Sequence, residues 1–198
     1  MEVQHALQLT GGVAKQIYFE PRKPAGAEHF YGLLHATKNR FLVTFQYHKL
    51  WEAHSTARRV RPLALKEFRS RWYLLALEVL RKRFAKTPQL DVSALYHDAF
   101  GILTPDDDAP HDVVLWFEPV QARYVRTFPL HPSQRVESED ADGLTLRLRV
   151  RLTHDFVMEL LFFGPQVKVL KPAALIREMR STLQAALAHH GAPESEDT

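Results

Sequence analysis

The feature that most constrains this chain is a run from Arg58 to Lys86 that is both basic and rich in strand-forming residues. At its centre, residues 71–76 are Arg-Trp-Tyr-Leu-Leu-Ala, and aromatic and aliphatic residues at this density favour a β-sheet. From Lys38 to Lys86 there are 13 Lys or Arg and 3 Asp or Glu, a local charge of +10 in a chain whose total is +3. A basic sheet of this kind indicates either an anionic partner or a solvated basic surface.

Composition limits the class of protein. The 198 residues suffice for one large domain or two small ones, with 45% hydrophobic and 25% charged residues, as in ordinary soluble proteins. No apolar run reaches the ~18 residues that span a bilayer, and the amino terminus does not resemble a secretory signal. The chain has no cysteine, which excludes disulfides, thiolate catalysis and cysteine-ligated zinc. These features lead us to expect a cytoplasmic protein without a membrane partner.

The first half of the chain predicts a helix followed by an antiparallel meander. Residues 28–40 have apolar side chains at helical spacing, and the residues after them alternate with a period of two. Strands are expected at 41–48, 56–65, 71–80 and, interrupted by Pro88, near 84–91. The polar residues 66–70 are expected to connect two of these strands. A meander of this size closes naturally into a small barrel, because closure removes exposed sheet edges.

The second half predicts the element order β-α-β-β-α-β, which is ferredoxin-like, with one more helix at the end. The expected elements are strands at 113–117, 134–139, 144–152 and 166–170, and helices at 119–128, 153–163 and from 172 onward. An acidic, proline-flanked segment at 105–110 is the best boundary between the halves. Residues 1–27 are expected to be a linker, and residues 191–198 a disordered tail.

Strand alternation predicts which basic side chains share a face. Arg59 and Arg61 point to one side of their strand, and Arg71 and Tyr73 share a side opposite Trp72. Guanidinium groups bind phosphates in a bidentate manner, and a phenol ring stacks on a base, so such a face suits a nucleic acid or a nucleotide. The alternative is structural: Trp72 belongs to the core, and the arginines protect an exposed edge.

A second basic set lies in the second half, at Arg123, Arg126, Arg147, Arg149 and Arg151. It could continue a nucleic-acid path, remain solvated, or pair with acidic residues of a partner subunit. Eleven histidines raise the question of a metal, but there is no His-Glu-x-x-His and no His-x-His. Nucleotide-binding and hydrolase motifs are also absent. We therefore predict neither a metal site nor an enzyme.

The central run resembles the WYL domain, which is named for a Trp-Tyr-Leu tripeptide found here at 72–74. The preceding Arg-x-Val-x-Pro element is present, with Arg-Val-Arg-Pro at 59–62, and the lead-in Lys-Glu-Phe-Arg at 66–69 is also typical. The resemblance covers roughly residues 27–190. It implies an α+β fold, with an Sm-like (SH3-type) β-barrel over residues 28–104 and the ferredoxin-like carboxyl-terminal extension over 111–190.

The resemblance also implies a function. WYL domains resemble ligand-sensing modules of bacterial transcription regulators, several of which respond to single-stranded DNA or another nucleic-acid signal. Matching positions imply ligand contacts, with no cofactor, at Tyr47, Arg59, Arg61, Arg71 and Tyr73. The family often has Leu-Asp-Arg-Ile where this chain has Leu-Asp-Val-Ser at 90–93, so Lys86 is the candidate to replace that arginine.

Such regulators usually have a winged helix-turn-helix before the WYL domain, through which they bind DNA. None is visible in this sequence. We therefore expect either the regulatory half of a regulator or a stand-alone accessory protein that binds RNA or single-stranded DNA. The apolar stripe of the last helix, at Leu175, Ile176, Met179, Leu183 and Leu187, is compatible with a homodimer and equally with a monomer that buries it.

Overall fold

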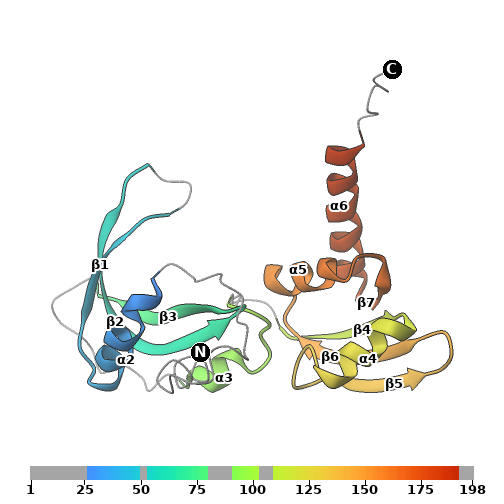
Figure 1. Ribbon diagram of the computed structural model, residues 1–198, viewed down its shortest axis with the longest axis horizontal. Helices are drawn as coiled ribbons and strands as arrows, with labels where there is room; N and C mark the ends of the chain where they lie inside the picture. Colours follow the sequence, from blue (N-terminus) through green and yellow to red (C-terminus); the bar gives the residue numbers. More distant parts are fainter. Residues whose placement is uncertain (1–25, 50–52, 80–90, 103–108, 192–198) are drawn as a thin grey trace, which may run out of the picture. The chain divides into compact units, whose positions relative to one another are not determined.

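The computed structural model describes residues 26–49, 53–79, 91–102 and 109–191 (Figure 1). The chain divides into two compact units, Met1–Leu80 and Arg81–Thr198. Each unit contains an antiparallel sheet and at least one helix, which confirms the predicted α+β class.

The first unit begins with a 3-10 turn at Ala27–His29 and helix α2 at Phe30–Lys38. Its sheet has the order β1-β2-β3, with bounds Val43–Tyr47, Thr56–Phe68 and Arg71–Glu78. These elements confirm the predicted helix and its three following strands. The described strands form an open sheet and no closed barrel. The strand expected near 84–91 lies outside the described residues.

β2 continues three residues beyond its predicted end, because residues 66–68 belong to the strand and only residues 69–70 form the turn. The strand runs to Phe68, and the chain reverses at Arg69 and Ser70, whose φ angles are 50° and 62°. Two-residue turns with positive φ match the right-handed twist of a hairpin. The Ser70 N–H also donates to Oε1 of Glu67 at 2.5 Å. Polarity alone therefore misplaced the end of this strand.

A β-bulge in β2 determines which side chains share a face. Pro62 pairs with Ala76 and Ala64 pairs with Leu75, so Leu63 is an extra residue. Such an insertion changes the alternation of the strand beyond it. Helix α2 packs on the face that contains Trp72, whose ring centroid lies 4.6 Å from that of Phe30.

The second unit contains α3 (Val92–Tyr96) and then the predicted β-α-β-β-α-β order with its terminal helix. The elements are β4 (His111–Phe117), α4 (Pro119–Thr127), β5 (Arg135–Glu139), β6 (Leu144–Val150), α5 (His154–Phe162), β7 (Val167–Lys171) and α6 (Ala173–His190). The sheet order is β5-β6-β4-β7, and every pairing is antiparallel.

The core of the second unit lies on one face of this sheet. Phe117 of β4 and Leu146 of β6 are fully buried there, and α4, α5 and α6 all contribute to the same cluster. All three helices therefore cover the same side of the sheet.

Thr153 fixes the start of α5, because its hydroxyl accepts from the Phe156 N–H at 3.1 Å and donates to the Phe100 carbonyl at 2.9 Å.

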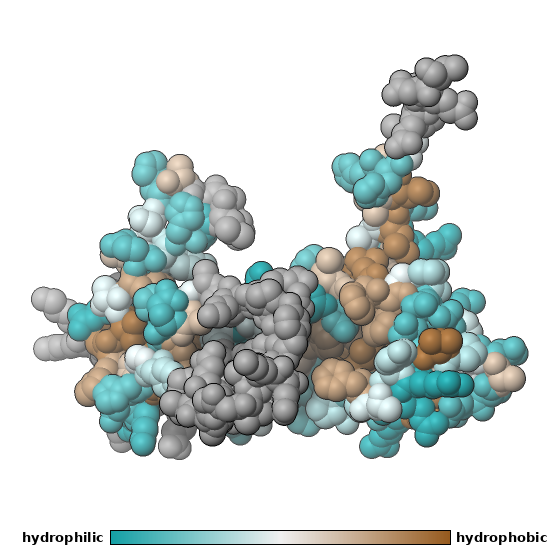
Figure 2. Space-filling model, viewed as in Figure 1, coloured by the Kyte–Doolittle hydropathy of each residue, from teal (hydrophilic) through white to brown (hydrophobic). Residues whose placement is uncertain are grey.

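Helix α6 is buried only in its first half. Leu175 and Met179 belong to the core, whereas Leu183 is 48% exposed and Leu187 is 70% exposed. The carboxyl-terminal half extends away from the sheet, and Figure 2 shows apolar surface along it.

In the part of the chain that the structure describes, no helix combines the length and apolar character needed to cross a bilayer.

Candidate functional site

Four of the six predicted contact residues lie on one face of the β1-β2-β3 sheet. Arg59 pairs with Thr44, Arg61 with Leu77, and Tyr73 with Lys66. Directly paired residues share a face, and alternate residues along a strand return to it. Following both strands through the bulge places Arg59, Arg61, Arg71 and Tyr73 on the side opposite Trp72, and we call these four residues the Tyr73 face.

The Tyr73 face is a long surface, and its basic residues lie at its two ends. Arg71 and Tyr73 are beside the hairpin turn, whereas Arg61 pairs with Leu77, four residues further along β3. At about 3.4 Å per residue, the backbone positions opposite Arg61 and at Tyr73 are about 14 Å apart. Ala64, Leu75 and Leu77 occupy the same face between them. The geometry therefore suits an extended ligand better than a compact one.

Two neighbouring arginines of β2 differ in their contacts. Arg58 lies on the opposite face, where its guanidinium contacts Oε1 of Glu78 at 2.5 Å and lies 5.7 Å from the centroid of the Tyr47 ring. Arg59 and Arg71 are exposed, and within the described residues neither makes an ion pair or a side-chain hydrogen bond. Their charges remain available to an anion.

The other two predicted residues do not join this group. Tyr47 pairs with Thr56 and lies on the Trp72 side of the sheet, next to Arg58. Lys86 lies outside the described residues. The structure adds Lys66, which the sequence did not single out and which pairs directly with Tyr73. The bulge at Leu63 places Lys66 on this face, and Pro62 directly before it is the sequence signal for that bulge, because proline within a sheet is confined to edges and bulges.

Trp72 and Leu74 pack against helix α2, which is the structural role offered above as the alternative to ligand binding. With Phe30 and Leu33 of α2 and Leu65 of β2, they line a hollow of about 50 Å³. Among the described residues, the buried Trp72 indole N–H has no hydrogen-bond partner. The hollow has room for only a few water molecules, so this side of the sheet mainly holds α2 in place.

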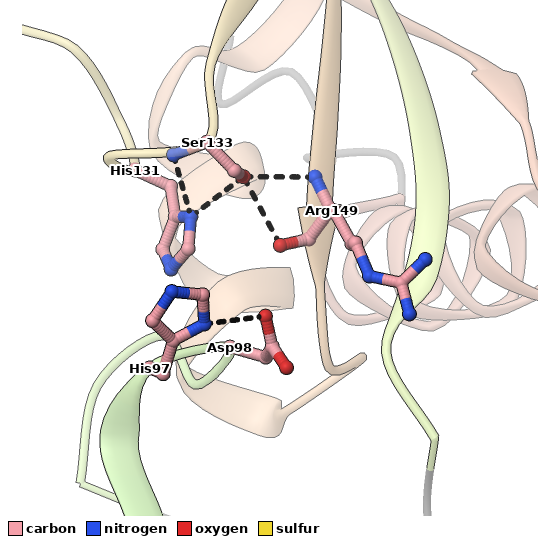
Figure 3. A network of polar contacts seen from close by, with 5 residues as sticks. All are labelled: His97, Asp98, His131, Ser133 and Arg149. Carbon is pink, nitrogen blue, oxygen red and sulfur yellow. Dashed lines mark hydrogen bonds and ion pairs between the residues drawn. The ribbon is translucent and has the colours of Figure 1, made fainter. Parts of the chain in front are cut away.

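A second polar cluster, in the second unit, contains a serine, an aspartate and two histidines (Figure 3). Oγ of Ser133 lies 2.8 Å from Nδ1 of His131. Serine, histidine and aspartate are the residue types of hydrolase triads. However, Oγ also accepts from the Arg149 N–H at 2.9 Å and donates to the Arg149 carbonyl at 3.1 Å. The hydroxyl thus joins the turn after α4 to β6, and we assign it no nucleophilic role.

Burial controls the charge of His131, which is 6% exposed. Desolvation lowers the pKa of His131, while the charge of Asp98 and a hydrogen bond with the backbone of His97 offset this in part. The charge of His97 acts in the same direction as burial. Because Nδ1 accepts from the Ser133 N–H at 3.2 Å, the neutral ring fits this site.

The second basic set is divided by the sheet of the second unit. Arg126 of α4 contacts Oε2 of Glu139 at 2.6 Å, and Arg147 contacts Oε1 of Glu137 at 2.5 Å. Arg149 is exposed, and its side chain points away from the histidine cluster (Figure 3). Among the described residues, no three His, Asp or Glu side chains gather as a metal site would require.

Comparison with known families gives two adjacent matches. A model described as the WYL domain matches residues 28–86, and a model described as the WCX domain matches residues 109–187. No curated protein matches the chain.

One similar solved structure is that of proteasome accessory factor B/C (PafBC) of Arthrobacter aurescens. The identity is 19% and the TM-score 0.37, over 98% of this chain and 33% of the PafBC chain. The chain thus spans about a third of the length of that protein.

Proposed function

The chain is a WYL domain-containing protein whose WYL domain is followed by a WCX domain, and we propose that it is the ligand-sensing part of a transcription regulator. In this proposal the Tyr73 face binds single-stranded nucleic acid. The observation that supports this most strongly is the register of β2 and β3, which puts Arg59, Arg61, Arg71 and Tyr73 on one side of the sheet.

The spacing of these residues favours an oligonucleotide over a single nucleotide. A ligand that reaches both the Arg61 end and the Tyr73 end has to extend about 14 Å along the strands. Several linked phosphates can meet both basic ends, while bases stack on Tyr73 or contact Leu75 and Leu77 between them. We further propose that the first sheet is part of an Sm-like barrel and that the WCX domain, with its order β5-β6-β4-β7, is ferredoxin-like.

Sensing requires that the ligand favour one arrangement of the regulator over another. In this proposal, binding on the Tyr73 face shifts that balance and thereby changes DNA binding by a helix-turn-helix domain outside this chain. The direction of the shift then depends on which arrangement exposes Arg71 and Tyr73.

The test is binding of labelled single-stranded DNA, single-stranded RNA and a mononucleotide, followed by fluorescence anisotropy. We expect Arg71→Ala with Tyr73→Ala to weaken oligonucleotide binding by about fivefold or more, since loss of base stacking alone costs about 1–3 kcal/mol. Arg58→Ala is the matched control, because it removes one positive charge from the opposite face. Unchanged oligonucleotide affinity in the double variant would reject the site, and stronger binding of the mononucleotide would reject the extended ligand.

A further inference from the structure

The face of the second sheet that points away from the helices has a row of basic residues. Lys171 of β7 pairs with Val114 of β4, Val114 pairs with Arg147 of β6, and Arg147 pairs with Arg135 of β5. Directly paired residues point to the same side, so this row crosses all four strands, with the buried Val114 between its basic residues. At about 4.8 Å between strands, it spans about 14 Å.

A second row beside it adds an aromatic ring. Lys168, Trp116, Thr145 and Ser138 pair in the same way across the four strands. The Trp116 ring packs over the β5-β6 turn, where a Cβ on Gly143 would lie 2.6 Å from its Nε1. The absence of a side chain at Gly143 therefore leaves the space that the indole occupies. No residue of either row belongs to the core cluster that α4, α5 and α6 cover.

The charge on this face is mostly uncompensated. Its basic residues are Arg135, Arg147, Arg149, Lys168 and Lys171, and its acidic residues are Asp112, opposite Arg149, and Glu137. Only the ion pair between Arg147 and Glu137 forms among the described residues of this face. Four basic side chains thus remain to meet an anion.

From this arrangement we infer that the open face of the WCX sheet is a second binding surface for single-stranded nucleic acid. Cations spread over 14 Å match a chain of phosphates better than one phosphate group. The broad face of a sheet can take splayed bases, one of which would stack on Trp116. An acidic peptide would use the cations and leave Trp116 without a role.

This inference goes beyond the proposed function, because it concerns a different domain and different residues. The test uses the full chain with a labelled oligothymidylate at two salt concentrations. We expect Trp116→Ala to weaken binding about fivefold or more, and Trp116→Phe to retain most of it. We expect Arg149→Ala with Lys168→Ala to reduce the slope of log affinity against log salt by about 1.4, at about 0.7 per phosphate contact.

The matched control is Arg177→Ala with Arg180→Ala, which removes the same charge from exposed positions on α6 and should leave the slope unchanged. Repeating the measurements in the Arg71→Ala, Tyr73→Ala background separates this surface from the Tyr73 face. Residual binding that disappears with the Arg149 and Lys168 changes supports the inference, whether or not the first site exists. A slope that those changes leave intact, or polyglutamate binding that equals oligonucleotide binding, overturns it.

Discussion

At the scale of single residues, position on a strand decides what an arginine does. Arg58 and Arg59 are adjacent, yet the first is held by Glu78 on the Trp72 side and the second is exposed on the other. Alternation predicted this division from the sequence. The pairing with Glu78 could not be predicted, because Arg58 and Glu78 are 20 residues apart in the chain and meet only through the register of β2 against β3.

The first prediction concerns His131, whose pKa is lowered in the folded protein by burial. Unfolded, the ring titrates near 6.5, so the unfolded state takes up a proton first as the pH falls. The contribution of neutral His131 to stability is therefore complete above about pH 6.5 and is lost as the pH falls toward its folded pKa. We expect the melting temperature to fall over this range, and His131→Asn to flatten the fall, because asparagine does not titrate. Its Oδ1 can still accept from the Ser133 N–H and so keep the local structure.

The comparison variant is His154→Asn, which removes an exposed histidine at the start of α5 and should keep the wild-type pH dependence. Thermal unfolding followed by circular dichroism at several pH values gives both curves. If wild type and His131→Asn lose stability in parallel, burial of His131 does not contribute to acid sensitivity.

At the scale of elements, α6 shows that an apolar stripe does not by itself say how much of a helix is buried. The stripe from Leu175 to Leu187 was predicted, but only the first two turns contact α5 and the sheet closely enough to bury Leu175 and Met179. Leu183 and Leu187 follow at the same four-residue spacing and remain exposed. Periodicity identifies the face of a helix, whereas the extent of the neighbouring elements determines where burial stops.

The second prediction follows from this division of α6. Leu175→Ala removes a fully buried side chain and should lower the free energy of unfolding by about 2–5 kcal/mol. Leu183→Ser with Leu187→Ser should change it by less than about 0.5 kcal/mol per substitution, because both side chains are exposed. Urea denaturation of the three proteins at equal concentration gives the comparison. A large loss of stability in the Leu183, Leu187 variant that grows on dilution would instead reveal that this half of α6 is buried between two chains.

The elements of the second unit were predictable because several signals agree at each boundary. Pro119 at the start of α4, Thr153 or Asp155 at the start of α5 and alternation in β6 mark limits within two residues of those that the structure shows, with Thr153 as the cap. In the first unit, the Arg69–Ser70 turn has none of the usual glycine or asparagine signals, so the polarity of the residues before it predicts a loop where the strand continues. The bulge at Leu63, which decides that Lys66 joins Tyr73, has only Pro62 as its signal, and a proline within a strand indicates either an edge or a bulge.

At the scale of the whole molecule, the two units differ in the quality of their cores. Among the described residues, every large side chain that is fully buried belongs to the second unit, for example Phe117, Phe156 and Leu146. In the described residues of the first unit, the buried apolar side chains are small, such as Ala36 and Val60. Regions with few buried apolar contacts open at lower free energy, and ligand-binding segments are often drawn from them.

The third prediction is that the two units lose structure separately. Leu146→Ala should weaken the second unit by about 2–5 kcal/mol and speed amide exchange throughout β4 and β6. Exchange in β2 and β3 should stay at the wild-type rate, because those strands belong to another compact unit.

In the wild type, β2 and β3 should already exchange faster than β4 and β6. An oligonucleotide bound on the Tyr73 face should slow exchange in β3 selectively. Hydrogen exchange read by mass spectrometry resolves each strand pair. Equal acceleration of all four strands by Leu146→Ala would mean that the chain opens as one cooperative unit. It would contradict the prediction that the two units lose structure separately.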